Sequence, residues 1–358
     1  MGEVTHTKKT FAKKQKGENK KKMEVKKMSN GMRGMLGAYA RFGKEAQGTT
    51  VKEVLRNANA DFNIGMESVY TKDGKVIPNQ FRTFREDTDE TFGVVKGTYK
   101  VMQNERLLNI SDDLVKRGVV DWDRIGLVDN GRKIVASFKM PEGFSIGGMD
   151  DVDQYIMLQN TNDGSGGIRI LPSNVRVTCS NQFTYMQSLL NKMGINKNAL
   201  TIRHSARQED RIAQLVEALK IVDHLNQTFM ETATELINVE MSQDDRINFY
   251  IDTLGLKQNE DMMKGGKDYD ANNPYGLGTR GQNTLDTLLE LEKADTNTLN
   301  GMENSAWAAF NVATEYIDHA WSHTKDGKSS DSKVESAIVG AGARMKSNAW
   351  ETITEMYA

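Results

Sequence analysis

Arginine and lysine side chains recur between residues 169 and 207, where they could bind phosphate groups. Arg169 stands between two isoleucines and Arg176 between two valines, so each side chain should leave an extended strand on one face. A planar guanidinium group matches two phosphate oxygens at once, which suits arginine to such contacts. The candidate phosphate-binding residues of this stretch are Arg169, Arg176, Lys192, Arg203 and Arg207.

Three aromatic residues, Tyr155, Phe183 and Tyr185, flank the same strands. Aromatic rings stack on nucleobases of any sequence, at about 1–3 kcal/mol per base. If the strands that carry Arg169 and Arg176 lie side by side, their guanidinium groups line one groove beside these rings. The pattern predicts a groove for single-stranded nucleic acid, although a solvated sheet face with ordinary salt bridges has the same residue pattern.

The first 30 residues are strongly basic, with ten lysines against three glutamates in a chain whose net charge is −2. Such a segment buries too little apolar surface to offset its ordering entropy, so we expect it to be disordered. It could contact the phosphates of a nucleic acid, or it could be a solubilising tail. The lysines assigned to phosphate contacts are Lys13, Lys14, Lys21 and Lys22.

A polar loop, "NTNDGSGG" over residues 160–167, raises the question of a phosphate-binding loop. Such a loop presents backbone N–H groups ahead of a helix and carries Gly-Lys-Ser/Thr, whereas this one leads into a strand-like run. A chain reversal at Asp163-Gly164 is therefore the favoured interpretation. A nest of N–H groups that binds an anion stays open.

Residues with nucleophilic or metal-binding side chains are few. The single cysteine, Cys179, has no histidine nearby in sequence, which favours a buried structural thiol over a nucleophile. His319 and His323 stand one helical turn apart, but the His-Glu-x-x-His pattern of zinc enzymes is missing. The sequence therefore assigns no catalytic residue, metal or cofactor. A hydrolase or nuclease that uses Asp163, Cys179, His204 or His319 stays an alternative.

The composition bounds the class of protein. A chain of 358 residues with 38% hydrophobic content suits one large globular domain or two ordinary ones. No run approaches 18 consecutive apolar residues, and the basic N-terminus lacks the apolar centre of a secretory signal. A lone cysteine excludes an internal disulfide. We therefore expect a cytoplasmic protein with no membrane segment.

The elements that position these residues fall into three segments. Residues 1–49 are expected to be a basic, Gly/Met-rich flexible arm. Residues 50–200 should form an α+β core domain with an antiparallel or mixed sheet, and residues 201–358 a helical region packed on it.

Extended segments dominate the core. Asn130-Gly131 predicts a type I′ turn between two strands rich in β-branched residues. Pro172 predicts a bend or an edge position, because proline donates no hydrogen bond to a ladder. The other expected strands are residues 66–71, 99–102, 154–160, 167–171 and 174–179.

Capping signals mark the helices of both halves. In the core, Thr50 and Ser111 should each cap a helix, the second ending at Gly118, and Ser180-Asn181 should cap a helix over residues 182–192. Apolar residues at steps of three and four then predict a long amphipathic helix. The helices expected in the C-terminal half are residues 209–241, 242–255, 304–323 and 333–357.

Several motifs in the same order resemble the phage/plasmid-like family, a group of proteins with a domain of unknown function. They include "TYKVMQNERLL", "DNGRKIVASF", "TCSNQF" and "TIRHSARQEDRI", within residues 58–358. The family pattern in the polar loop is His-Asp-Gly-Ser, where this chain has Asn162 before Asp163. Cys179 with Asn181, and Arg203 with His204, match two further family motifs.

The resemblance implies a phage or plasmid protein of DNA metabolism in the cytoplasm of a host cell. The order of elements is also similar to single-strand annealing proteins of the RecT and Red-beta type, which bind single-stranded DNA and form oligomers. We therefore expect a homo-oligomer that binds single-stranded nucleic acid without sequence readout, in recombination or replication. An alternative is a virion-associated structural or assembly protein whose subunits meet through Trp307, Trp321 and Trp350.

Overall fold

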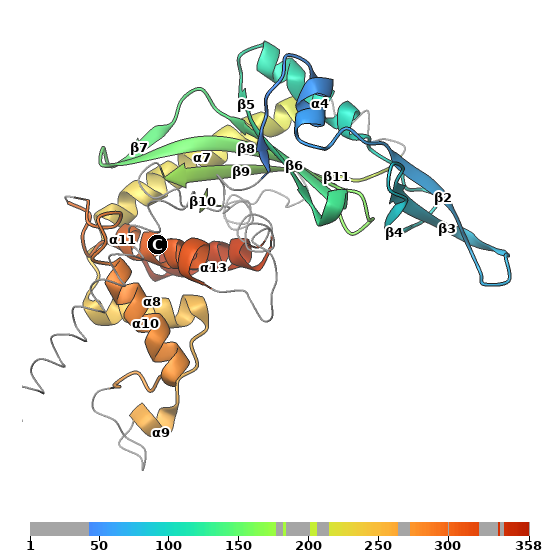
Figure 1. The fold of residues 1–358 in the computed structure, drawn as a ribbon. Helices are drawn as coiled ribbons and strands as arrows, with labels where there is room; N and C mark the ends of the chain where they lie inside the picture. The colour runs from blue at the N-terminus through green and yellow to red at the C-terminus, as the bar shows by residue number, and fades with distance from the viewer. Residues whose placement is uncertain are drawn as a thin grey trace, which may run out of the picture.

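The structure is a computed structural model with an α+β architecture, as the sequence predicts (Figure 1). It describes residues 43–176, 182–183, 201–205, 215–263, 273–299, 301–321, 336 and 340–357. No helix in these ranges is both long and apolar enough to cross a membrane. The candidate residues that lie outside them are Lys13, Lys14, Lys21, Lys22, Cys179, Tyr185, Lys192 and Arg207.

The larger sheet is antiparallel and forms the centre of the fold. Its order is β1 (Lys44–Glu45), β5 (Asp121–Val128), β6 (Lys133–Lys139), β8 (Asp150–Thr161), β9 (Ile168–Arg176) and β10 (Gln182–Phe183). Two short strands join it at the side: β7 (Phe144–Ile146) pairs with β8, and β11 (Thr201–Ile202) pairs with β9.

One face of this sheet packs into the main hydrophobic core. Ala136, Leu158 and Ile170 lie directly opposite one another across β6, β8 and β9, and all three are buried. Their neighbours at alternate positions share this face because side chains of a strand alternate between its two sides. Burying a leucine or isoleucine side chain contributes about 1.5–3 kcal/mol, so this apolar row fixes the register of the three strands.

A smaller three-stranded sheet projects from the rest of the molecule (Figure 1). It consists of β2 (Ile64–Tyr70), β3 (Val76–Arg85) and β4 (Glu90–Val95), in that order. The two sheets meet at the β8–β9 loop, where Thr83 Oγ1 donates to the backbone oxygen of Asn162 over 2.7 Å. A Cβ atom at Gly93 would lie 2.4 Å from the backbone oxygen of Asp163, so this close approach requires glycine.

The helices lie in two groups. The short helices α3 (Val51–Asn57) and α4 (Asn104–Lys116) pack against each other beside the larger sheet. The C-terminal group is α7 (Leu215–Ile237), α8 (Gln243–Leu254), α9 (Glu260–Met263), α10 (Thr279–Leu291), α11 (Ala306–Glu315), a π-helical turn (Tyr316–Ala320) and α13 (Ala341–Tyr357).

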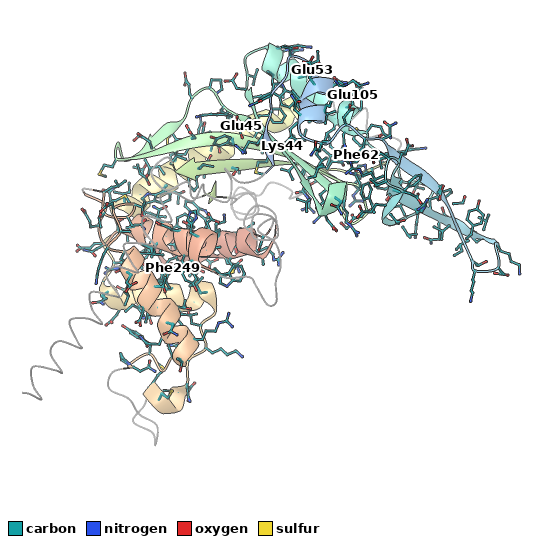
Figure 2. All side chains as sticks on the ribbon, in the orientation of Figure 1. Lys44, Glu45, Glu53, Phe62, Glu105 and Phe249 are labelled. Carbon is teal, nitrogen blue, oxygen red and sulfur yellow. The ribbon has the colours of Figure 1, made fainter. Side chains whose placement is uncertain are left out.

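Aromatic side chains join the C-terminal helices to the sheet. The Phe229 ring of α7 lies 5.9 Å from Trp307 and 4.6 Å from Trp350, and both tryptophans are fully buried. Trp307 Nε1 donates to Asp150 Oδ2 over 2.9 Å, which ties α11 to β8. Figure 2 shows the fully buried Phe249 of α8 in the same helical group. Trp307 and Trp350 are therefore core residues, which leaves no surface of these two rings for a subunit contact.

Several local predictions are confirmed. Thr50 caps α3 in a capping box with Glu53, and a second box joins Ser242 to Asp245 at the start of α8. Gly255 ends α8 with φ +59°, a left-handed conformation that favours glycine. At the β5–β6 hairpin, the Arg132 N–H donates to the oxygen of Asp129 across Asn130 and Gly131, both with positive φ, as a type I′ turn requires.

Other predictions are wrong. Residues 99–102 lie between β4 and α4 rather than in a strand, and α4 begins at Asn104, so Ser111 lies inside it. Gln182 and Phe183 form β10 instead of the first turn of a helix. The runs 167–171 and 174–179, expected as separate strands, share the single strand β9, which is described to residue 176.

Pro172 explains why the sequence predicted two strands where the structure has the single strand β9. On one side β9 pairs with β8 along its length, and Pro172 lies opposite Ile156. On the other side β11 pairs with Ile168 and Arg169, and β10 with Asn174 and Val175. Pro172 falls between these two partners, where, in the part of the chain described, no strand requires its missing N–H. The predicted edge position is therefore correct, and the predicted break is not.

Candidate functional site

Two exposed arginines meet where β11 pairs with β9. Arg169 lies directly opposite Thr201, and both side chains leave the sheet on the same face. Arg203 follows two residues later, exposed between the buried Ile202 and His204. This alternation continues the strand pattern and directs Arg203 to the face of Arg169.

Lys100 is a third exposed cation, and its backbone is held near Arg203 by His204. The carbonyl oxygen of Lys100 lies 3.0 Å from His204 Nδ1, and a carbonyl only accepts, so Nδ1 carries a proton. The Tyr99 ring packs against the imidazole with centroids 4.6 Å apart. His204 is only 8% exposed, so it serves as an anchor for the Lys100 backbone. We call Lys100, Arg169 and Arg203 the cationic edge.

The cationic edge has little compensating negative charge. None of its three residues forms an ion pair with a carboxylate in the part of the chain that the structure describes. Asp163 is the nearby acidic group, since its charge acts on Tyr99. Burial and, secondarily, this carboxylate raise the pKa of Tyr99 far above its usual value, which keeps the phenol neutral.

The polar loop beside the edge is a tight turn, as favoured from the sequence. The backbone N–H of Ser165 donates to Asp163 Oδ1 over 2.8 Å, and Gly164 has φ +81°. Asn162 is 1% exposed. Its Nδ2 donates to the oxygen of Gly131 and its backbone N–H to that of Arg132, at 2.9 and 2.8 Å. Its role is to hold the loop onto the β5–β6 hairpin.

Arg176 does not share a groove with Arg169. Both positions belong to β9, and the pairing with β8 runs without a register shift from Val152–Arg176 to Gln159–Arg169. Positions seven apart in a regular strand lie on opposite faces and about 23 Å apart. The expected convergence of these two residues is therefore wrong, because it assumed two neighbouring strands.

The aromatic candidates lie away from the cationic edge. Tyr155 of β8 is 8% exposed, with Lys139 Nζ 5.9 Å from its ring centroid and paired with Asp153 at 2.8 Å. Burial, followed by the charges of Asp123 and Asp153, raises the pKa of Tyr155. Little of this ring is left for a base to stack on. Phe183 lies in β10, opposite Asn174, near the far end of β9.

Metal-binding residues do not gather within the described ranges: no group of three or more His, Cys, Asp or Glu side chains there could hold a metal ion. His319, the other histidine considered from the sequence, lies in the π-helical turn after α11. Asp163 and His204 both lie near Tyr99, but one carboxylate and one imidazole do not make a set of metal ligands.

Sequence reasoning missed Lys100, which it placed in a strand with no link to Arg203. Its contact with His204 joins residues 104 positions apart. The Arg-His pair at 203–204 was the available signal, because an imidazole N–H can donate to the backbone carbonyl of a distant segment.

Comparison with known proteins defines the family. A family model described as Domain of unknown function (DUF932) matches residues 91–339, more than half of the chain, and this range includes the whole cationic edge. No curated protein and no solved structure matched. The chain belongs to the DUF932 family, whose domain is described as one of unknown function.

Proposed function

We propose that this protein binds single-stranded nucleic acid without sequence readout, with its cationic edge on the phosphate backbone. The pairing of β11 with β9 carries the proposal, because it brings Arg169 and Arg203 onto one exposed face. Lys100 adds a third positive charge through the His204 contact. Contacts to phosphate position a protein on a strand but convey no sequence information.

The family resemblance supplies the biological setting of this proposal: phage or plasmid recombination or replication. The lysine-rich first 30 residues add further phosphate contacts. The net charge of −2 does not oppose such binding, since local charge governs contact with a polyanion.

The salt dependence of binding tests the proposal. Each phosphate neutralised on a single strand contributes about −0.7 to the slope of log affinity against log salt. Replacing Arg169→Ala and Arg203→Ala together should therefore flatten the slope by about 1.4. Between 50 and 200 mM salt, affinity should then fall about seven-fold less than for the unmodified protein. Fluorescence anisotropy of a labelled 20-nucleotide oligomer measures both slopes.

A matched control removes the same charge elsewhere. Arg280, in the first turn of α10, and Lys293, just after its end, are both exposed. The variant Arg280→Ala/Lys293→Ala should keep the original slope. The proposal fails if the oligomer does not bind at 50 mM salt, or if the two double variants give the same slope.

A further inference from the structure

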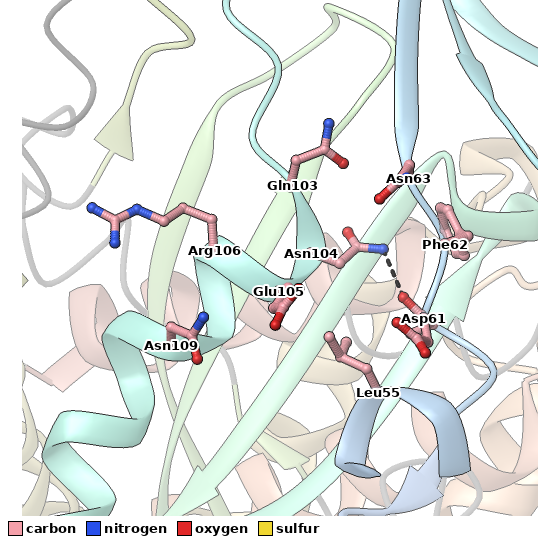
Figure 3. A pocket seen from close by; sticks show the side chains of 10 residues that line it. Leu55, Asp61, Phe62, Asn63, Gln103, Asn104, Glu105, Arg106 and Asn109 are labelled. Atoms are coloured by element: carbon pink, nitrogen blue, oxygen red, sulfur yellow. Dashed lines mark hydrogen bonds between the residues drawn. The ribbon is translucent and has the colours of Figure 1, made fainter. Parts of the chain in front are cut away.

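A small pocket lies at the start of α4, beside the base of the projecting sheet (Figure 3). Its volume is about 230 Å³, below the range of drug-sized sites and suited to a single small ring system. Leu55, Ala60 and Phe62 give it an apolar side. The polar side is formed by Asp61, Asn63, Gln103, Asn104, Glu105, Arg106 and Asn109.

The first turn of α4 presents hydrogen-bond donors to this pocket. Gln103 precedes the helix, and its oxygen accepts the first helical bond from the N–H of Leu107 at 3.0 Å. Its side chain cannot cap the helix, because its Oε1 and Nε2 both bond the backbone of Ile64 at 2.9 Å. The N–H groups of a first turn have no partner within the helix and carry partial positive charge. They favour a carbonyl oxygen.

Asn104 contributes an acceptor at the same place. It is 1% exposed, and its Nδ2 donates to the oxygen of Ala60 over 3.0 Å. Its Oδ1 finds no hydrogen-bond partner among the described residues. In Figure 3 this oxygen points toward the space between Gln103 and Asn63. A buried acceptor without a partner is costly, and a ligand N–H would remove that cost.

A carbonyl acceptor next to an N–H donor is the pattern of a cyclic amide. Thymine and guanine carry this N–H/C=O edge, whereas adenine and cytosine present an amino N–H beside a ring-nitrogen acceptor. We propose that the pocket binds the cyclic amide edge of a thymine or guanine base. This proposal rests on the proposed function, because it adds a base-binding subsite to the phosphate-binding edge.

The two sites lie close along the chain. Lys100 belongs to the cationic edge and Asn104 to the pocket, so at most four residue lengths, about 14 Å, separate their Cα atoms. That span lies within the reach of a nucleotide strand whose phosphates contact the edge while a base turns into the pocket. Protein sites for single strands commonly hold such splayed bases.

Nucleosides test the pocket on the full-length chain, without any phosphate. Thymidine should bind, and N3-methylthymidine, which lacks the N–H, should bind about ten-fold more weakly or worse. Deoxyadenosine should bind more weakly than thymidine, because a ring nitrogen takes the place of the carbonyl oxygen. Isothermal titration gives the three dissociation constants. Equal binding of thymidine and N3-methylthymidine, or no binding of thymidine, would overturn the proposal.

A pair of variants ties the result to one atom. Asn104→Ala removes the acceptor and should abolish the preference for thymidine over N3-methylthymidine, with circular dichroism as the check of folding. Asn109→Ala removes an exposed amide from the same lining and should keep the preference. If Asn104→Ala does not fold, the comparison of thymidine with N3-methylthymidine on the unmodified protein still tests the proposal.

An abasic oligonucleotide separates this proposal from the proposed function. Binding of the abasic strand with a steep salt slope, but no binding of thymidine, would remove the pocket and keep the cationic edge. Binding of thymidine, but of neither an abasic nor a thymine oligonucleotide, would support the pocket and contradict the proposed function.

Discussion

A buried ion pair between α13 and the π-helical turn gives a quantitative test of the helical region. Lys346 Nζ lies 2.7 Å from Asp318 Oδ1, and each side chain is 1% exposed. Neither charge can regain water while the helices stay packed. Removing one partner leaves the other charge buried without its ion-pair partner, which typically costs about 3–5 kcal/mol.

Lys346→Met and Asp318→Asn should therefore each destabilise the protein by about 3–5 kcal/mol. With an unfolding entropy of about 2.1 cal/mol/K per residue over the roughly 260 residues that the structure describes, this lowers the melting temperature by about 5–9 °C if the chain unfolds as a unit. The double variant removes both charges, so it should recover at least about 2 kcal/mol of the summed loss.

Urea unfolding monitored by tryptophan fluorescence measures the three variants, because Trp350 lies on the same helix as Lys346. The pair Lys116–Asp112 on α4, with N and O 2.6 Å apart and an exposed lysine, is the control. Its variants Lys116→Met and Asp112→Asn should change stability by about 0.5 kcal/mol or less. The reasoning is refuted if the double variant is as unstable as the sum of the single variants.

Two further predictions concern a turn and a buried phenol. Gly131→Ala places a Cβ at φ +108° and 2.5 Å from the Phe62 ring, so urea unfolding should show a loss of about 1–3 kcal/mol, more than for Gly74→Ala, where nothing lies within 4 Å. Burial and Glu292 raise the pKa of Tyr250 above that of an unfolded tyrosine, so the folded protein keeps the phenol neutral. The contribution of Tyr250 to stability is therefore full below pH about 10, and it decreases as the pH rises above that value. Between pH 10 and 11, the Tyr250→Phe variant should lose up to about 1.4 kcal/mol less unfolding free energy than the unmodified protein. Equal losses in the two proteins would contradict this prediction.

Local signals in the sequence predicted local structure well. Thr50, Ser242 and Gly255 act within one helical turn, so their side-chain and backbone preferences decide the helix ends without distant partners. The prediction that Ser111 caps a helix was wrong, because a capping preference is only local. Burial of Leu107 and Leu108 favours a helix that begins earlier, at Asn104.

Partners of the strands could not be predicted from the sequence. β9 continues through Pro172 because β10 and β11 arrive from residues 182–183 and 201–202 and leave that position uncovered. A strand's own residues do not specify which later segment pairs with it. Arg169 was correctly placed on a strand face, but its partner across the sheet is Thr201, two residues before Arg203, and Arg176 lies farther along the same strand.

The polar loop at residues 160–167 has a structural role: it positions its neighbours. Its Asn162 oxygen accepts from Thr83 of β3, and its Thr161 oxygen accepts from the Tyr99 hydroxyl at 3.2 Å. Tyr99 packs on His204, and His204 holds the backbone of Lys100. A change in the loop would therefore shift Lys100 without touching it.

Asn162 makes that dependence specific. Replacing Asn162 with histidine would disrupt the short amide contacts of Asn162 with Gly131 and Asn160. The loop residue and the hairpin residue must then be compatible with each other, because the hairpin receives the Asn162 amide. The spacing between the two sheets, and with it the position of the cationic edge, depends on this pair more than on any reactive group in the loop.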